Sequence, residues 1–180
     1  MKTGQTDPDQ KKVLRLYAAF GAALALSVVP FVLAAFLSMV LFLGVLIAAY
    51  ILRTGTEEGS LIENHMGFII RTIWIGSFLA LLTIVVASIY LFYGMDNTPL
   101  DPCIQHFLSI GPGTRVLELQ AMTDIFRSCY GAYMDANLRI FIMSGVIAAG
   151  PVLIYFIARY ARGISRAMNG YRIAKPENWF

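Results

Sequence analysis

Four side chains around the start of the second long apolar stretch could together form a polar site. Glu63 and His65 precede this stretch, and Arg71 and Trp74 lie at its beginning. Ionisable groups that reach into a membrane segment can form ion sites, so these residues are a candidate interface or gate. We favour a different interpretation, an anchor in which the Arg71 stem reaches back to the lipid headgroups and the Trp74 ring lies at the interface, and keep the gate as the alternative.

The only two cysteines, Cys103 and Cys129, lie in one polar segment between apolar stretches. That segment is predicted below to be extracytoplasmic, and this compartment is oxidising. We therefore predict a disulfide between them, which closes a loop of about 26 residues and contributes about 3 kcal/mol by chain entropy. The alternative is two unpaired thiols. His106 lies three positions after Cys103, but a zinc site needs about four ligands.

No other set of residues has the types and spacing of a catalytic centre. Lysines and arginines flank the apolar stretches and do not form the basic patch of a nucleic-acid-binding surface. The sequence therefore predicts no catalytic residues, no metal, no cofactor, no nucleic-acid partner and no enzymatic activity.

The elements that must carry these residues are membrane helices. The chain is 58% hydrophobic and 14% charged, whereas a soluble domain has about 25% charged residues. Three stretches contain no charged residue: Leu16 to Leu52, Thr72 to Met95 and Ile140 to Ala158. Each is long enough to cross a hydrocarbon core of about 30 Å. We predict an all-α, polytopic membrane helical bundle with the lipid bilayer around it, folded as a single membrane domain over residues 1–180.

The first stretch is too long for one ordinary crossing. Pro8 and Pro30 each suit the first turn of a helix, so a hairpin is predicted; the alternative is one long kinked helix. The four predicted spans are about 8–28, 30–53, 66–93 and 137–163. An extracytoplasmic loop of about 45 residues, 94–136, joins helices three and four. Apolar residues at helical spacing predict an amphipathic helix on the membrane face over 114–133.

Basic residues beside the spans predict the orientation. They are concentrated in the N-terminal segment and in the tail over 164–180, which places both termini in the cytoplasm. Arg159, Arg162 and Arg166 are spaced by three and four positions and so share one helix face. This basic face would meet anionic headgroups at the membrane surface; the alternative is a docking site for a partner protein.

Several short motifs carry a resemblance to a known group. They are His65, Ile70 to Trp74, Tyr155 to Gly163, and Lys175 to Glu177. With these motifs the chain resembles small four-span bacterial inner-membrane proteins of unknown function, which are loosely related to the Tic translocon-channel superfamily. The resemblance implies four spans and an inner-membrane location, and the family implies no established activity. The long cysteine-bearing loop departs from the family pattern, in which this connection is brief.

The sequence thus predicts a protein of the bacterial inner membrane that acts through protein contacts. It would be an accessory or assembly subunit of a larger membrane complex, or a homo-oligomer, with the extracytoplasmic loop facing the partner. The alternative is a small channel or translocation component.

Overall fold

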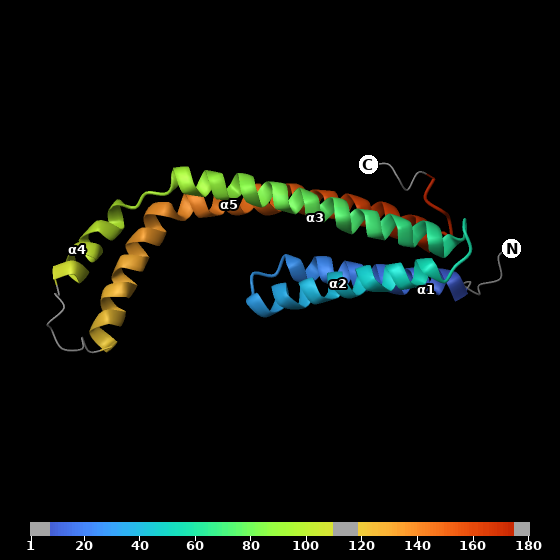
Figure 1. Cartoon of the computed structure of the whole chain (residues 1–180), viewed down its shortest axis with the longest axis horizontal. Coiled ribbons are helices and arrows are strands. Elements are labelled where there is room, and N and C mark those ends of the chain that lie inside the picture. Colours follow the sequence, from blue (N-terminus) through green and yellow to red (C-terminus); the bar gives the residue numbers. More distant parts are fainter. Residues whose placement is uncertain (1–7, 110–118, 175–180) are drawn as a thin grey trace. The chain divides into compact units, whose positions relative to one another are not determined.

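The computed structural model describes residues 8–109 and 119–174, and these contain helices and no strand. The helices are α1 (Pro8–Ser27), α2 (Val32–Thr54), α3 (Leu61–Gly94), a 3₁₀ turn (Thr98–Leu100), α4 (Asp101–Ser109) and α5 (Leu119–Met168) (Figure 1). The predicted all-α class is confirmed.

Three helices of the described chain are long and apolar enough to cross a membrane. They are α2, α3 and the part of α5 from Cys129 to Met168. The chain itself buries no more than 22% of the most apolar window of each helix. Large aliphatic and aromatic side chains therefore face outward along all three helices, as they do in helices surrounded by lipid.

The helix boundaries correct part of the prediction. α3 begins at Leu61, earlier than the predicted 66, and α5 begins at Leu119, whereas the predicted start was 137. The segment between α3 and α5 is therefore shorter than the predicted loop 94–136, and it contains α4. The predicted amphipathic helix over 114–133 starts outside the described residues, and its remainder is the first part of α5. This helix continues because no proline interrupts it before Pro151, and polar residues alone do not end a helix.

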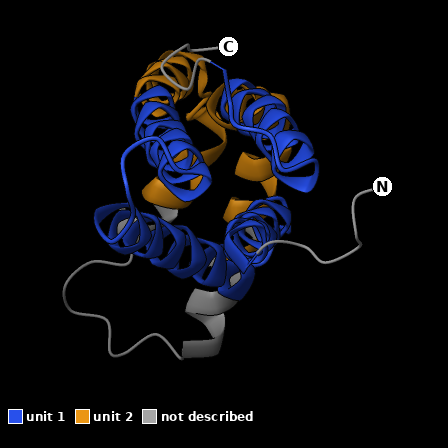
Figure 2. Cartoon of the chain, turned by 90° about the vertical axis from the view of Figure 1, so that its right-hand side faces the viewer, with its two compact units in different colours: residues 1–81, 151–180 blue, residues 82–150 orange. Residues whose placement is uncertain are grey.

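The chain forms two compact units, which share α3 and α5 (Figure 2). Unit 1 comprises residues 1–81 and 151–180, and unit 2 comprises residues 82–150. The core of unit 1 draws on α1, α2, the first part of α3 and the last part of α5. At its centre the rings of Phe20, Phe42 and Phe156 contact one another, with centroids 5.4 to 6.1 Å apart.

α1 and α2 form an antiparallel hairpin in unit 1 (Figure 1). The Ser38 hydroxyl donates a hydrogen bond of 2.8 Å to the Ala23 carbonyl, and Phe20 packs on Phe42. The predicted hairpin is thus present, although α2 begins at Val32 after an extended Phe31, and Pro30 precedes both.

The end of α5 is closed by a glycine turn. Gly170 has φ +67°, its N–H donates to the Ala167 carbonyl, and the N–H of Tyr171 donates to the Arg166 carbonyl. This pairing is the Schellman motif, in which glycine adopts the left-handed conformation at little steric cost. Gln10 of α1 donates to the carbonyls of Ala167 and Met168, so α1 also caps this helix end.

Unit 2 is held by hydrogen bonds from side chains of one helix to the backbone of the other. Thr83 donates to the Ala148 carbonyl at 2.8 Å, and Ser144 donates to the Ala87 carbonyl at 3.2 Å. Such interhelical bonds are typical of packed membrane helices.

A turn follows α3 in unit 2, and Asn137 binds it from α5. The Asn137 amide accepts from the backbone N–H of Asp96 and donates to the Asp96 carbonyl, at 2.7 and 2.8 Å. The Asp96 carboxylate accepts from the hydroxyl and the backbone N–H of Thr98, and these bonds lower the pKa of Asp96 from its ordinary value. The turn is therefore stabilised by both side chains.

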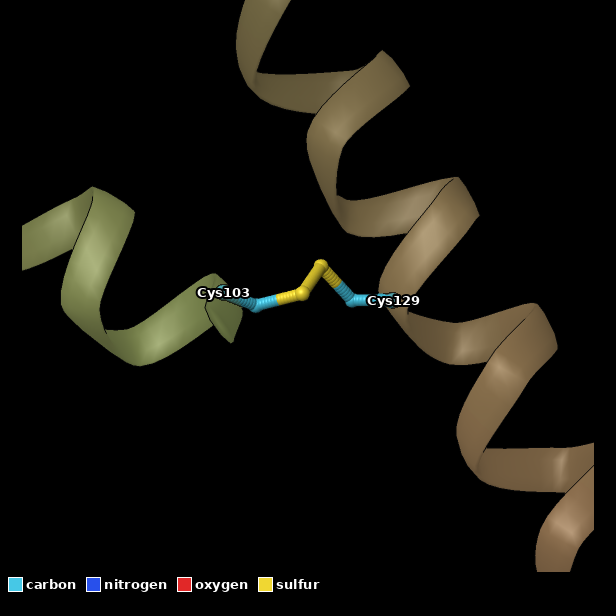
Figure 3. Close-up of a disulfide and its surroundings, with 2 residues drawn as sticks. All are labelled: Cys103 and Cys129. Atoms are coloured by element: carbon cyan, nitrogen blue, oxygen red, sulfur yellow. A yellow bond between two sulfur atoms is a disulfide. The ribbon is translucent and has the colours of Figure 1, made fainter. Parts of the chain in front are cut away.

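Cys103 of α4 and Cys129 of α5 form the predicted disulfide (Figure 3). Their Cα atoms are 6.2 Å apart, within the usual range for this bond. The disulfide therefore attaches α4 covalently to α5.

Gly163 of α5 allows a close approach between α1 and α5. A Cβ atom at this position would lie 2.7 Å from ring carbons of Tyr17. We expect Gly163→Ala to reduce the free energy of unfolding by about 1–3 kcal/mol, because an overpacked core is strained. Thermal unfolding in detergent measures the effect. The matched control is Gly145→Ala on the same helix, where a Cβ would meet nothing within 4 Å. Equal losses in the two variants would contradict the close approach.

Candidate functional site: a buried polar cluster

Four of the buried polar side chains of unit 1 form one group, although the helices around them are apolar. Tyr17, His65 and Thr72 are 0% exposed and Arg159 is 2% exposed. They come from α1, α3 and α5, and we call them the buried polar cluster. His65, Phe68 and Thr72 recur at three and four positions, so they share the inner face of α3.

Both nitrogens of the His65 ring have partners. Nε2 lies 3.0 Å from the carbonyl oxygen of Tyr171, and Nδ1 lies 3.2 Å from the hydroxyl of Tyr17. Because the carbonyl can only accept, Nε2 carries the hydrogen and Nδ1 accepts from Tyr17. The imidazole of His65 therefore connects α1, α3 and the C-terminal segment.

Arg159 is placed by α3. Its Nε donates to the Thr72 hydroxyl at 3.2 Å, and its Cζ lies 3.8 Å from the centroid of the Phe68 ring. The Thr72 hydroxyl in turn donates to the Phe68 carbonyl. A hydrogen bond and a cation–π contact offset part of the cost of taking the charge out of water. The ring of Tyr17 lies 6.2 Å from that of Tyr160, the residue next to Arg159 in α5.

Asn64 holds the C-terminal segment on α3 next to this cluster. Its amide donates to the Ile173 carbonyl at 3.1 Å, and the Ile173 N–H donates back to its oxygen at 2.7 Å. Ile173 is 2% exposed. The chain beyond α5 is therefore folded back onto the start of α3, where His65 also binds it.

The four residues of the candidate gate do not converge. His65 belongs to the buried cluster, while Glu63 pairs with Arg53 at 3.4 Å. Trp74 is exposed, and its indole N–H donates to the Tyr50 hydroxyl at 3.1 Å. Arg71 is also exposed. Arg71 and Trp74 thus lie on outer positions, which an anchor requires, and Glu63 is half-buried in its ion pair.

The proposed basic face needs a correction. Arg166 is exposed and Arg162 is half-buried, but Arg159 lies inside unit 1. The spacing correctly puts the three arginines on one side of α5, yet spacing does not tell how far a neighbouring helix covers that side. Here Thr72 and Phe68 of α3 cover Arg159.

Sequence reasoning missed Tyr17 and Thr72. Both lie in apolar runs where a hydroxyl alone attracts no notice. For the burial of Arg159, however, one signal was present in the sequence. Arg159 follows the charge-free stretch directly and is flanked by Tyr155, Phe156 and Tyr160. An arginine among aromatic residues is a good candidate for a buried cation–π contact.

The buried polar cluster positions the helices relative to one another. Its hydrogen bonds join helices, and within residues 8–109 and 119–174 no group of three or more His, Cys, Asp or Glu side chains could hold a metal ion. Tyr155, one turn before Arg159, is buried, and its hydroxyl has no hydrogen-bond partner among the described residues.

Asn64 provides a test of the folded-back segment. We expect Asn64→Ala to speed hydrogen exchange at the Ile173 amide at least about fivefold, because this N–H loses its acceptor. Hydrogen exchange followed by mass spectrometry measures the change. The control is Asn169→Ala, since the Asn169 amide donates only locally, to the Ser165 carbonyl. Unchanged protection at Ile173 in Asn64→Ala would refute the role of Asn64.

Comparison with family models, with curated proteins and with solved structures found no match to this chain. The resemblance to small four-span membrane proteins therefore stays a prediction.

Proposed function

We propose that this chain is a multi-pass protein of the bacterial inner membrane without catalytic activity, which acts as an accessory or assembly subunit of a larger membrane complex. The observation that carries this proposal is the helix pair braced by the disulfide. Next to the two cysteines, Ile104 of α4 and Tyr130 of α5 are both more than half exposed. A covalent brace reduces the entropy that a contact surface loses on binding.

The proposal includes four crossings. α1 lies along α2, bound by the Ser38 to Ala23 hydrogen bond and by the contact of Phe20 with Phe42. If α2 is immersed in lipid, α1 is at the same depth, so its short apolar part crosses as half of a hairpin. The composition of α1 alone indicates a span only weakly, and the pairing of α1 with α2 supports it.

The proposed orientation follows from one end of unit 1. The start of α1, the end of α2, the start of α3 and the end of α5 meet there, through contacts such as Gln10 to Ala167, Arg53 to Glu63 and Asn64 to Ile173. The basic residues of these helix ends are Lys11, Lys12, Arg15, Arg53, Arg71, Arg162, Arg166 and Arg172. By the positive-inside rule this end is cytoplasmic.

Three hydroxyl groups within the spans support a role in helix–helix contacts rather than in ion or solute conduction. Ser38, Thr83 and Ser144 each donate to a backbone carbonyl of a neighbouring helix. A channel or translocation component needs polar groups that face an open path. These three hydroxyls instead bind helix to helix.

The cysteines report on the proposed topology. We expect an impermeant maleimide added outside spheroplasts to label neither Cys103 nor Cys129 before reduction and both after reduction. The disulfide explains the first result, and an extracytoplasmic position explains the second. A gel shift after labelling measures the outcome. Labelling without reductant would contradict the disulfide, and no labelling after reduction, despite labelling in detergent, would contradict the orientation.

The partner-facing role is tested by copurification in mild detergent. We expect a stoichiometric partner to accompany the tagged wild-type chain and to be lost, by tenfold or more, from Ile104→Asp, because a charge in an apolar contact must be desolvated. Quantitative mass spectrometry measures recovery. Gln105→Asp is the matched control, since Gln105 is the exposed neighbour on α4.

Two outcomes would refute the subunit proposal. One is recovery of the wild-type chain alone, as a monomer or homo-oligomer. The other is a partner whose recovery is the same in both variants. Ion and solute flux in reconstituted vesicles would then test the channel alternative.

A further inference from the structure

Unit 1 contains three positively charged side chains near one another: Arg71, Arg159 and Arg162. Arg159 binds the hydroxyl of Thr72, the residue next to Arg71 in α3. Arg162 lies three positions after Arg159, and side chains with this spacing are neighbours on a helix. Arg71 and Arg162 are both within Coulombic range of Arg159.

The three side chains differ in exposure. Arg159 is enclosed by the protein, Arg162 is half-buried and Arg71 is exposed. Neither Arg71 nor Arg162 pairs with a carboxylate in the part of the chain that the structure describes. Two accessible guanidinium groups therefore lie near a third, buried charge that strengthens the positive potential between α3 and α5.

A neighbouring aromatic pair indicates the depth of these charges in the bilayer. Trp74 lies one turn after Arg71, and its exposed ring donates a hydrogen bond to the exposed Tyr50 of α2. Exposed Trp and Tyr on membrane helices mark the interface with water. Arg71 is one turn nearer to the polar end, which is the level of the phosphates.

We propose that Arg71 and Arg162 bind the phosphate group of an anionic phospholipid in the cytoplasmic leaflet, with Arg159 adding its charge from inside unit 1. Guanidinium groups bind phosphate oxygens through short, charge-assisted hydrogen bonds, often in pairs. Basic sites between membrane helices are typical positions for anionic lipid headgroups. The inference rests on the proposed membrane placement and is independent of the partner-binding role.

Binding is measured on the full chain in detergent by native mass spectrometry. Phosphatidylglycerol, phosphatidylcholine and inorganic phosphate are titrated separately. We expect saturable binding of phosphatidylglycerol, at least about tenfold weaker binding of phosphatidylcholine, and no displacement of the lipid by millimolar inorganic phosphate. Displacement by inorganic phosphate, or equal binding of the two lipids, would overturn the assignment to an anionic lipid.

Charge-neutralising variants locate the site. The double variant Arg71→Gln, Arg162→Gln is expected to bind phosphatidylglycerol at least about tenfold more weakly, since it loses hydrogen bonds from charged donors. The control is Arg166→Gln, which removes a neighbouring exposed charge of α5 and should change affinity less than about threefold. Because these side chains lie outside the core, the circular dichroism of each variant is expected to be native.

Equal losses in the double variant and in Arg166→Gln would show a diffuse surface potential and overturn the specific site. Retained binding in the double variant would do the same. Loss of lipid binding with partner recovery intact would leave the subunit proposal standing, so the two proposals fail separately.

Discussion

The contact of Arg159 with Thr72 and Phe68 constrains the pairing of α3 with α5 in unit 1. A guanidinium is too costly to bury unless hydrogen bonds and an aromatic face compensate for the lost water. Both compensating groups lie on α3, so α5 can satisfy its arginine only at one register. Sliding either helix by one turn would break this combination of contacts. The next turn of α5 places Gly163 against the ring of Tyr17 in α1.

A second interaction, between an asparagine amide and a backbone segment, occurs in both units near the end of a long helix. In unit 1 the amide of Asn64 binds both the N–H and the C=O of Ile173, and in unit 2 the amide of Asn137 does the same for Asp96. Helix ends leave backbone groups without partners, and lipid supplies none. An asparagine satisfies a donor and an acceptor together and ties two segments distant in sequence. Each unit thus closes one of its turns with a single asparagine.

Much of the architecture follows from where charges are missing. Leu16 to Leu52 and Thr72 to Met95 predict the hairpin and α3, because only helices satisfy the backbone in lipid. The pairing of Cys103 with Cys129 also follows, since no other cysteine exists. The start of α5 was not predictable, because Asn137 reads as a polar break in sequence and becomes an interior contact only once Asp96 is beside it. Arg159 was assigned to a surface for the same reason: periodicity gives the side of a helix, and only the neighbouring helix decides burial.

The polar side chains of the interior differ in their contacts from those of the surface. In unit 1 the polar side chains of the interior bind one another, as His65 does with Tyr17 and Arg159 with Thr72. In unit 2 the hydroxyls of Thr83 and Ser144 bind backbone carbonyls. Groups engaged in this way hold helices together and are not available to a solute. Our two proposals accordingly place recognition at accessible side chains: Arg71 and Arg162 in unit 1, and the residues next to the disulfide in unit 2. If both proposals hold, the protein acts by holding lipid and protein neighbours at fixed positions.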